Sequence, residues 1–429
     1  MTLPESMKDV IKPHAMKRRR VLLIGTFYPT HQFAGNSTTG IAGLLAILPS
    51  MEMVTVIAQR GASTPVGRLW ASVRVIPCWQ HNSLLSLLRL LRTVAHQVGD
   101  SDSVVFNTYL TAFGKSKFTN AMGLMLPTLV ARLHRVPVTT YMHNMFETQD
   151  VRSLGYSPSQ VDYKVVRFIE KMLLQHTRVA LPLRSQVEVV SREFGLRAVE
   201  APLPFVETFV AMGASWTTLK KAALRQRDGT LRVLLFGNWG PQKDLTGALE
   251  ALATAIQVGA KVEVVIGGCP SPMFPDYLKT FNELRKKYSS KTMRFIGQVK
   301  EEEVLVLIAN SDAVLLPYRA TGGYSGALNC AALLGRLIIA YDQPQLREHA
   351  AELGVAPVWV GAGDVTQLAS TILHLSLQSQ EFPFTTWEAI NAKIAESCWA
   401  VAHAIGIEWP GIEAVRARML ELFKSTNAE

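Results

Sequence analysis

The segment Leu231-Arg-Val-Leu-Leu-Phe-Gly-Asn-Trp-Gly-Pro-Gln-Lys-Asp244 decides the fold class. Residues 231–236 are typical of a buried strand, a short loop with glycine and proline follows, and residues 245–258 are expected to form a helix. A strand, a short loop and a helix in this order are the repeating unit of parallel α/β sheets. Lys243 is therefore expected beyond the carboxyl end of a strand, where open α/β sheets bind ligands.

The same unit repeats on both sides of this segment. In the first half, a strand begins at Arg20 and ends in a loop by Pro29, and strands at 54–58, 73–77, 104–107, 136–142 and 179–182 are interspersed with helices at 40–48, 84–97, 121–134 and 163–176. In the second half, strands are expected at 262–266, 293–296, 313–317 and 337–340, with helices at 275–288, 301–309 and 325–334. The pattern predicts an α/β protein with two Rossmann-like domains that face a cleft.

The domain boundaries follow from changes in composition. Residues 1–16 are expected to be a flexible, polar lead-in, and residues 17–205 the first domain. The proline-rich stretch Ala201-Pro-Leu-Pro-Phe205 is a candidate linker to a second domain at 206–385. Residues 386–429 are expected to form terminal helices, at 387–405 and 412–423, that pack back across both domains.

Composition excludes some classes of protein and leaves others open. The 429 residues are 48% hydrophobic and 18% charged, which excludes wholesale disorder. The formal net charge of +10 favours anionic partners, whether phosphorylated substrates, a membrane surface or nucleic acid. The four cysteines are scattered without metal-ligand spacing, which favours reduced thiols in a cytoplasmic protein. No signal peptide and no apolar run near the ~18 residues of a membrane span is found.

A loop of small residues in the first half is a candidate phosphate site. Gly35-Asn36-Ser37-Thr38 follows the first strand and precedes a helix, so its backbone amides could approach a phosphate. An ordinary turn feeding a helix explains the same residues. The loop is neither a GxGxxG dinucleotide fingerprint nor a P-loop with its lysine.

A second loop of this kind lies in the second half. The connection after the strand at 313–317 contains Gly322, Gly323 and Gly326, which add no side chains to it. The Ser325 hydroxyl and the amides of Gly326 and Ala327 either cap the next helix or hold phosphate oxygens. Lys243 is likewise either a solvated loop residue or a partner for a diphosphate.

Four motifs in a fixed order carry a resemblance to a known family. They are Gly-x5-Lys at 237–243, Phe295-Ile-Gly-Gln-Val299, Ser311-Asp-Ala-Val-Leu-Leu-Pro-Tyr318, and Ser325-Gly-Ala-Leu328 followed by Leu337-Ile-Ile-Ala340. Together they resemble family-4-type glycosyltransferases of GT-B fold, over about residues 19–395. The resemblance implies a retaining, metal-independent enzyme without a cofactor. Its sugar would come from a nucleoside-diphosphate donor bound by the C-terminal domain, and the N-terminal domain would hold the acceptor.

The resemblance also implies roles for single residues. His143, at the end of a predicted strand, would orient the donor sugar or relay a proton. Lys243 would meet the donor diphosphate. The remaining donor-binding positions implied are Gly35 and Asn36 in the N-terminal loop, Asn238, the backbone of Gln298 and Val299 at the nucleobase, and Ser325, Gly326, Ala327 and Leu328 at the diphosphate.

Three positions depart from the family pattern. Asn238 stands where the family has an arginine, and Gly322 and Cys330 stand where it has the two glutamates of an E-x7-E motif. Neither glycine nor cysteine supplies a carboxylate. The departures leave a second hypothesis open, a catalytically silent homologue that acts as partner subunit of an active transferase. A sugar epimerase of the same fold lacks obvious carboxylates here.

The sequence bears on the acceptor only through two segments of the first domain that combine basic and apolar residues. Leu84-Leu-Ser-Leu-Leu-Arg-Leu-Leu-Arg92 and Phe113-Gly-Lys-Ser-Lys-Phe118 combine basic and apolar residues, as segments that rest on the anionic inner face of a membrane do. Core burial behind a solvated basic face explains them equally. The net charge also permits a nucleic-acid acceptor, although no motif of the usual DNA- or RNA-binding folds is present.

Overall fold

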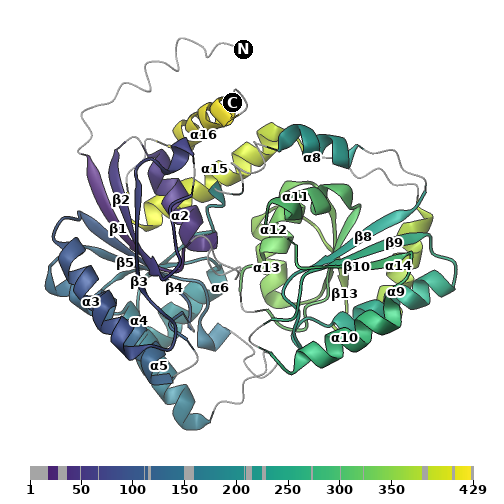
Figure 1. Cartoon of the computed structure of the whole chain (residues 1–429), viewed down its shortest axis with the longest axis horizontal. Helices are drawn as coiled ribbons and strands as arrows, with labels where there is room; N and C mark the ends of the chain where they lie inside the picture. Colours follow the sequence, from purple (N-terminus) through teal and green to yellow (C-terminus); the bar gives the residue numbers. More distant parts are fainter. Residues whose placement is uncertain are drawn as a thin grey trace. The chain divides into compact units, whose positions relative to one another are not determined.

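The computed structural model in Figure 1 consists of two compact units. Unit 1 comprises Met1–Thr148, Ser159–Ala214 and Asn391–Glu429, and unit 2 comprises Gln149–Pro158 and Ser215–Ile390. The structure describes residues 18–27, 36–48, 50–65, 67–110, 112–114, 117–148, 159–206, 208, 215–224, 229–271, 274–299, 301–321, 323–378, 385–407 and 411–426. The predicted lead-in at 1–16 lies outside these ranges.

Unit 1 is built on a seven-stranded parallel sheet with the order β3-β2-β1-β4-β5-β6-β7. Its strands are β1 (Arg19–Ile24), β2 (Met51–Gln59), β3 (Val73–Trp79), β4 (Ser103–Thr108), β5 (Val138–Met142), β6 (Arg178–Leu181) and β7 (Ala198–Glu200). Its helices are α2 (Asn36–Ile47), α3 (Leu84–Val98), α4 (Lys117–Leu133), α5 (Gln160–Leu174) and α6 (Arg184–Val189), with short turns at η2 (Arg68–Trp70), η3 (Phe146–Thr148) and η4 (Val190–Phe194).

Unit 2 repeats the arrangement with six parallel strands in the order β10-β9-β8-β11-β12-β13. The strands are β8 (Leu231–Phe236), β9 (Val262–Gly267), β10 (Met293–Gly297), β11 (Ala313–Leu316), β12 (Leu337–Tyr341) and β13 (Val358–Val360). The helices are α8 (Trp216–Ala223), α9 (Leu245–Gln257), α10 (Tyr277–Tyr288), α11 (Glu301–Asn310), α12 (Gly326–Leu333), α13 (Pro344–Glu352) and α14 (Val365–Leu377).

In each unit an apolar core holds helices against a face of the sheet. In unit 1, Leu90 and Val94 of α3 pack with Phe106 of β4 and with Leu173 of α5, and all four are fully buried. In unit 2, α9 and α14 lie side by side over the sheet and contribute leucines and alanines at helical spacing to the core. Burial of both faces explains why the strands read as continuous apolar runs.

The strand order reverses once in each sheet, between β1 and β4 in unit 1 and between β8 and β11 in unit 2. At such a point the loops beyond the carboxyl ends of the two strands diverge and leave room for a ligand. Two parallel sheets with this order confirm the predicted α/β class with Rossmann-like halves. They also direct the search for a site to the carboxyl edges.

The observed elements differ from the predicted ones mainly at their ends. Helix α2 begins at Asn36, so this residue opens a helix instead of lying in the loop before it. Helix α4 begins at Lys117 and continues through Pro127, where the sequence predicted a start at residue 121. The short elements α8, α13, β7 and β13, and helix α14, were not predicted. The short strands and helices among these elements contain too few residues to show a clear hydrophobic periodicity.

The terminal helices are α15 (Trp387–Ala404) and α16 (Ile412–Thr426). The boundary between the two units falls inside α15, after Ile390. Within unit 1, the Cys398 thiol lies 3.4 Å from the carbonyl oxygen of Pro204, and Arg19 donates a 3.2 Å hydrogen bond to the carbonyl oxygen of Gly406. The end of the chain thus packs on the first residue of β1 and on the predicted linker segment.

The glycines at the end of β9 provide a stability test. Gly268 has φ of 103°, and a Cβ added to it would lie 1.9 Å from the carbonyl oxygen of Gly237. Gly259 has nearly the same φ, 104°, but a Cβ there would meet nothing within 4 Å. Gly268→Ala should therefore destabilise unit 2 by about 2 kcal/mol more than Gly259→Ala, because the backbone clash adds to the same dihedral strain.

The measurement is the midpoint of thermal unfolding of both variants. A lower midpoint for Gly268→Ala than for Gly259→Ala is expected. Equal midpoints would show that β8 and β9 are not held this closely at their carboxyl ends.

Candidate functional site at the carboxyl edge of unit 2

Backbone hydrogen bonds tie together the loops that follow β8, β9 and β10. The amide of Trp239 donates to the carbonyl oxygen of Cys269 at 2.9 Å, and the amide of Gly268 donates to that of Gly297 at 2.6 Å. The indole Nε1 of buried Trp239 donates to the carbonyl oxygen of Gly267 at 3.0 Å. Three neighbouring loops therefore form one connected rim at the carboxyl edge of the sheet.

Lys243 lies on this rim at the end of the β8 loop. Its backbone pairs with Tyr318 in an isolated antiparallel bridge, which joins the β8 loop to the β11 loop. Its ammonium nitrogen lies 4.8 Å from the centre of the Tyr318 ring, in cation–π geometry. A Cβ on Gly237 would come within 2.5 Å of the same nitrogen, so the side chain folds back over the start of the loop.

The buried carboxylate of Asp244 connects three elements. One oxygen caps α9 by accepting from the Gly247 amide at 3.1 Å. The other accepts from the Arg319 guanidinium at 2.8 Å and from the Tyr341 hydroxyl at 3.2 Å. Burial, together with the nearby Asp244 charge, raises the pKa of Tyr277 to about 12 and also raises that of Tyr341. Asp244 thus fixes Lys243 relative to the β11 loop.

The glycine–serine loop before α12 has the geometry of an anion site. Ser325 is the N-cap of α12, and its hydroxyl oxygen accepts from the Leu328 amide at 3.3 Å. The amides of Gly326 and Ala327 belong to the first helical turn, where no intrahelical acceptor exists. A Cβ added to Gly326 would meet nothing within 4 Å, so the approach to these amides is open. The helix dipole adds positive potential at the same place.

His349 of α13 supports this loop from behind. Its Nδ1 accepts a 3.2 Å hydrogen bond from the Ser325 amide, and its ring lies 3.4 Å from that of Tyr324, measured between centroids. The side chain is fully buried, and burial lowers the pKa of His349 to about 3. The ring is therefore neutral, with its proton on Nε2, which has no partner among the described residues. No sequence signal pointed to this histidine.

The structure brings most of the predicted donor-binding positions to this one edge. Val299, after β10, is close enough that a Cβ on Gly267 would lie 3.0 Å from its side chain. Gln298 beside it is exposed, and Asn238 is half-buried in the β8 loop. Ser325, Gly326, Ala327 and Leu328 form the start of α12. Gly322 lies outside the described residues, and Cys330 is on α12.

His143 lies at the carboxyl edge of unit 1, directly after β5. Its Nε2 is 2.7 Å from Oδ1 of Asn107, at the end of β4, and Nδ2 of Asn107 donates to the Thr38 hydroxyl at 2.6 Å. In this chain of hydrogen bonds Asn107 accepts from His143, so the histidine carries its proton on Nε2 and presents Nδ1 as an acceptor. Although the residue keeps some exposed surface, desolvation of its imidazole lowers the pKa of His143 to about 3.

The first turn of α2 completes this second cluster. A Cβ on Gly25 would lie 2.7 Å from the Thr38 hydroxyl, so α2 approaches the end of β1 closely. Thr38 belongs to the predicted loop of small residues, but the sequence did not indicate that its hydroxyl and Asn107 position His143. Of the predicted loop residues, Gly35 lies outside the described residues, and Asn36 opens α2. The cluster sits where the strand order of unit 1 reverses.

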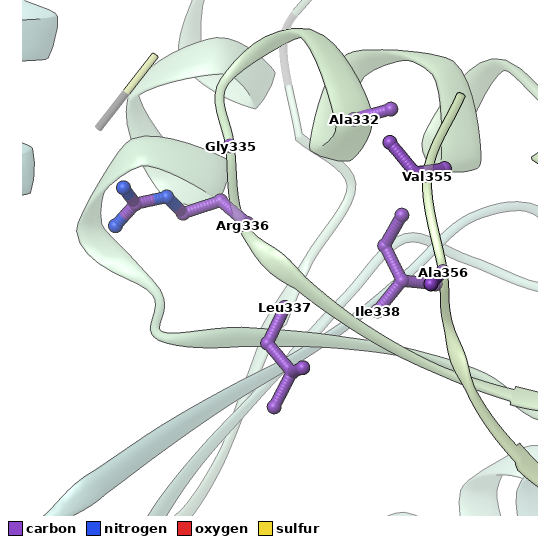
Figure 2. A pocket seen from close by; sticks show the side chains of 7 residues that line it. All are labelled: Ala332, Gly335, Arg336, Leu337, Ile338, Val355 and Ala356. Carbon is purple, nitrogen blue, oxygen red and sulfur yellow. The ribbon is translucent and has the colours of Figure 1, made fainter. Parts of the chain in front are cut away.

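A pocket at the opposite edge of unit 2 does not belong to this site. Figure 2 shows it beside the start of β12, lined by Ala332, Gly335, Arg336, Leu337, Ile338, Val355 and Ala356. Buried Arg336 donates to the carbonyl oxygens of Leu334 and Ser311. The guanidinium therefore satisfies backbone carbonyl groups just before the amino ends of β11 and β12.

Within the described ranges, His, Cys, Asp and Glu side chains nowhere gather in threes that could ligate a metal ion. Nor does any described helix combine the length and the hydropathy needed to cross a bilayer. The polar groups that the structure places at the two carboxyl edges are Lys243, the amides at the start of α12, and the two histidines.

Several solved structures are similar to this chain over almost its whole length. Anabaena HepE (Alr3699), in complex with UDP and glucose, is 14% identical with a TM-score of 0.61, over 95% of this chain and 100% of that one. Sucrose-phosphate synthase of Thermosynechococcus elongatus is 15% identical with a TM-score of 0.62, over 96% and 100%. The α,α-trehalose-6-phosphate synthase of Burkholderia multivorans is 11% identical with a TM-score of 0.54, over 96% and 97%. The chain has the GT-B fold.

At these identities the likeness shows the fold, and it confirms the resemblance to GT-B glycosyltransferases at that level. No protein-family model matches the sequence, and no curated protein matches it either. The assignment of single residues within the GT-B fold therefore depends on the geometry described above.

Buried His349 predicts a pH dependence of stability. The native pKa of His349 is about 3 against an ordinary value of 6.5, so the unfolded state binds more protons between these values. The stability that neutral His349 contributes is complete above about pH 6.5 and is lost as the pH falls toward 3. His349→Gln, which keeps an acceptor for the Ser325 amide but cannot titrate, should show a shallower fall.

Thermal unfolding midpoints measured from pH 7 down to the acid limit check this. His134→Gln, at an exposed position, is the control and should follow the wild-type curve. Parallel curves for His349→Gln and the wild type would contradict a neutral, buried His349.

Proposed function

We propose that this protein is a retaining glycosyltransferase that moves a sugar from a nucleoside-diphosphate donor to an acceptor. The observation that carries the proposal is the joint placement of Lys243 and the open first turn of α12 at the carboxyl edge of unit 2. Lys243 reaches this edge through its backbone bridge to Tyr318, and the loop from Tyr318 leads into the α12 N-cap Ser325. One cation and two helix amides that have no intrahelical acceptor suit a diphosphate.

The site would act mainly by stabilising the leaving group. When the bond between the anomeric carbon and the diphosphate breaks, the electron pair stays on the phosphate oxygen, and its negative charge grows in the transition state. Lys243 and the amides of Gly326 and Ala327 interact more strongly with that charge than with the intact donor, which lowers the barrier. Donor binding of this kind needs no metal ion, and we propose a metal-independent reaction without a cofactor.

The nucleoside would bind along the rim toward β10. The backbone of Gln298 and Val299 follows β10, one strand beyond the β9 loop that is hydrogen-bonded to the β8 loop. The HepE structures hold UDP and UDP-glucose, which supports uridine nucleotides as the first donors to test. The donor screen described below identifies the sugar.

His143 would hold the sugar and not relay a proton. Because its pKa is about 3, the imidazole is neutral throughout the physiological range and presents Nδ1 as an acceptor for a sugar hydroxyl. Asn107 fixes the tautomer and Thr38 fixes Asn107. A hydrogen bond donated by the sugar hydroxyl to this prepositioned acceptor orients the anomeric carbon at little entropic cost.

We also propose that the protein works in the cytoplasm, at the inner face of a membrane. No disulfide joins the four cysteines, all of which the structure describes. Two of them, Cys78 and Cys398, are buried, and burial raises the pKa of Cys78 to about 11, which keeps that thiol protonated and unreactive. Such thiols fit a reducing compartment.

A catalytically silent partner subunit is the second candidate. Asn238 and Cys330 favour it, because neither supplies the charge that the family pattern has at its position. Release of sugar from a donor by the isolated chain would exclude this candidate. Donor binding without any such release would favour it over the transferase.

Lys243→Ala tests the proposed diphosphate site. Thermal shifts of the wild type are measured against UDP-, GDP-, ADP- and dTDP-sugars, and hydrolysis of the stabilising donor is then followed. The variant should lose the donor-induced shift, and its hydrolysis rate should fall roughly 10²–10³-fold, because one preorganised cation is removed from the leaving group. Lys279→Ala, at an exposed position on α10, is the matched control and should behave as the wild type.

An unchanged shift and rate in Lys243→Ala would remove its role. No response of the wild type to any of the four donors would contradict the transferase itself.

His143→Ala separates sugar orientation from nucleotide binding. UDP alone should stabilise the variant as it does the wild type, whereas donor hydrolysis should fall about tenfold to a hundredfold, since one oriented hydrogen bond to the sugar is lost. His134→Ala serves as the control. Loss of UDP binding, or an unchanged rate, would show that His143 does not contact the sugar.

A further inference from the structure

Three neighbouring helices of unit 1 expose large apolar side chains. Helices α3, α4 and α5 pack side by side over one face of the sheet (Figure 1). On α3, Leu85 is 80% and Leu88 65% exposed, and on α4, Phe118 is 62% exposed. Soluble monomers rarely concentrate side chains of this size in one region of their surface.

Helix α5 has an outward apolar stripe of its own. Val161, Val165 and Phe168 recur every three to four residues and are exposed by 68%, 48% and 58%. Lys164 and Lys171 lie on the same side of the helix.

The charge of this surface is one-sided. Helices α3 and α4 contain no Asp or Glu, and they carry Arg89, Arg92, Lys117 and Arg132. Of the two acids of α5, Asp162 offsets only one of these bases, Lys117, and Glu170 offsets none. Asp162 is paired with Lys117 and caps its own helix, and Glu170 is fully buried with its pKa raised by desolvation.

The N-terminal ends of the three helices meet at the edge that carries His143. Each helix follows a parallel strand, so each begins at the carboxyl edge of the sheet. The segments before α3 and α4 are joined by a 3.0 Å hydrogen bond from the Asn82 amide to the Phe113 carbonyl oxygen. The rings of Phe146 and of Tyr163 on α5 lie 4.5 Å apart, and Phe146 is three residues beyond His143.

We propose that the outer surface of α3, α4 and α5 docks on an anionic lipid bilayer and that the acceptor is anchored in that bilayer. Leucine and phenylalanine side chains interleaved with lysine and arginine fit the boundary between acyl chains and acidic headgroups. The statement that the acceptor is anchored in the bilayer rests on the proposed function. The docking surface itself is inferred only from the side chains that α3, α4 and α5 expose.

Two other occupants fit the surface less well. A second copy of the chain would bring the same bases against each other, since a two-fold interface is self-complementary. A nucleic acid would use the bases but gains nothing from exposed Leu85, Leu88 and Val161. A bilayer satisfies both kinds of side chain at once.

Vesicle flotation of the full chain tests the proposal. The vesicles are phosphatidylcholine alone, or phosphatidylcholine with about one-third phosphatidylglycerol, at low and high salt. The wild type should float with the anionic vesicles at low salt and only weakly with the neutral ones. Leu85→Gln combined with Phe168→Gln should lower the partition coefficient by about tenfold or more. Lys164→Gln combined with Lys171→Gln should lower it on anionic vesicles alone.

The matched control is Leu278→Gln combined with Leu377→Gln in unit 2, where the two leucines are 52% and 71% exposed. This variant should float as the wild type does. A wild type that stays unbound, or a Leu85/Phe168 variant that floats equally well, would overturn the docking surface. So would self-association of the lipid-free wild type that the Leu85/Phe168 variant abolishes.

The thermal shift with UDP separates this proposal from the proposed function. The Leu85/Phe168 variant should keep the UDP-induced shift, because the donor site belongs to unit 2. Vesicle binding without any donor response would leave the docking surface standing and overturn the lipid-anchored acceptor. A donor response without vesicle binding would overturn the docking surface alone.

Discussion

The buried carboxylate of Asp244 is the interaction on which the site of unit 2 depends. It caps α9 and accepts hydrogen bonds from Arg319 and Tyr341, so a single charge joins the loops after β8 and β11 to the end of β12. A buried carboxylate is costly unless its oxygens are fully hydrogen-bonded, and here three donors satisfy them. Asp244 directly follows Lys243 in the chain. Because Asp244 is held in this way, the backbone of Lys243 is fixed at the carboxyl edge, where α12 also begins.

Both sheets place their polar clusters at the point where the strand order reverses, but the two clusters differ in chemistry. Unit 2 offers a cation and open helix amides, which suit a diphosphate. Unit 1 offers a neutral histidine in a chain of hydrogen bonds with Asn107 and Thr38, which suits hydroxyl groups.

Much of this could be predicted from the sequence, because the signals were local. The apolar runs before Gly237 and before the Ser325 loop fixed two strands and the helices after them, and Ser325 is the N-cap that its residue type suggested. The supporting groups could not be predicted. His349, Asn107 and Thr38 act on residues 24, 36 and 69 positions away along the chain. The stripe on α5 was missed because periodicity places apolar residues on one side of a helix without saying whether that side is covered.

The central claim is that unit 2 binds a nucleoside diphosphate at its carboxyl edge, and a crystal structure of the chain with UDP tests it most directly. The account predicts diphosphate oxygens within hydrogen-bonding distance of the Lys243 ammonium and of the amides of Gly326 and Ala327, with the base beside Val299. UDP bound elsewhere, or a site that stays empty at millimolar UDP, would contradict it.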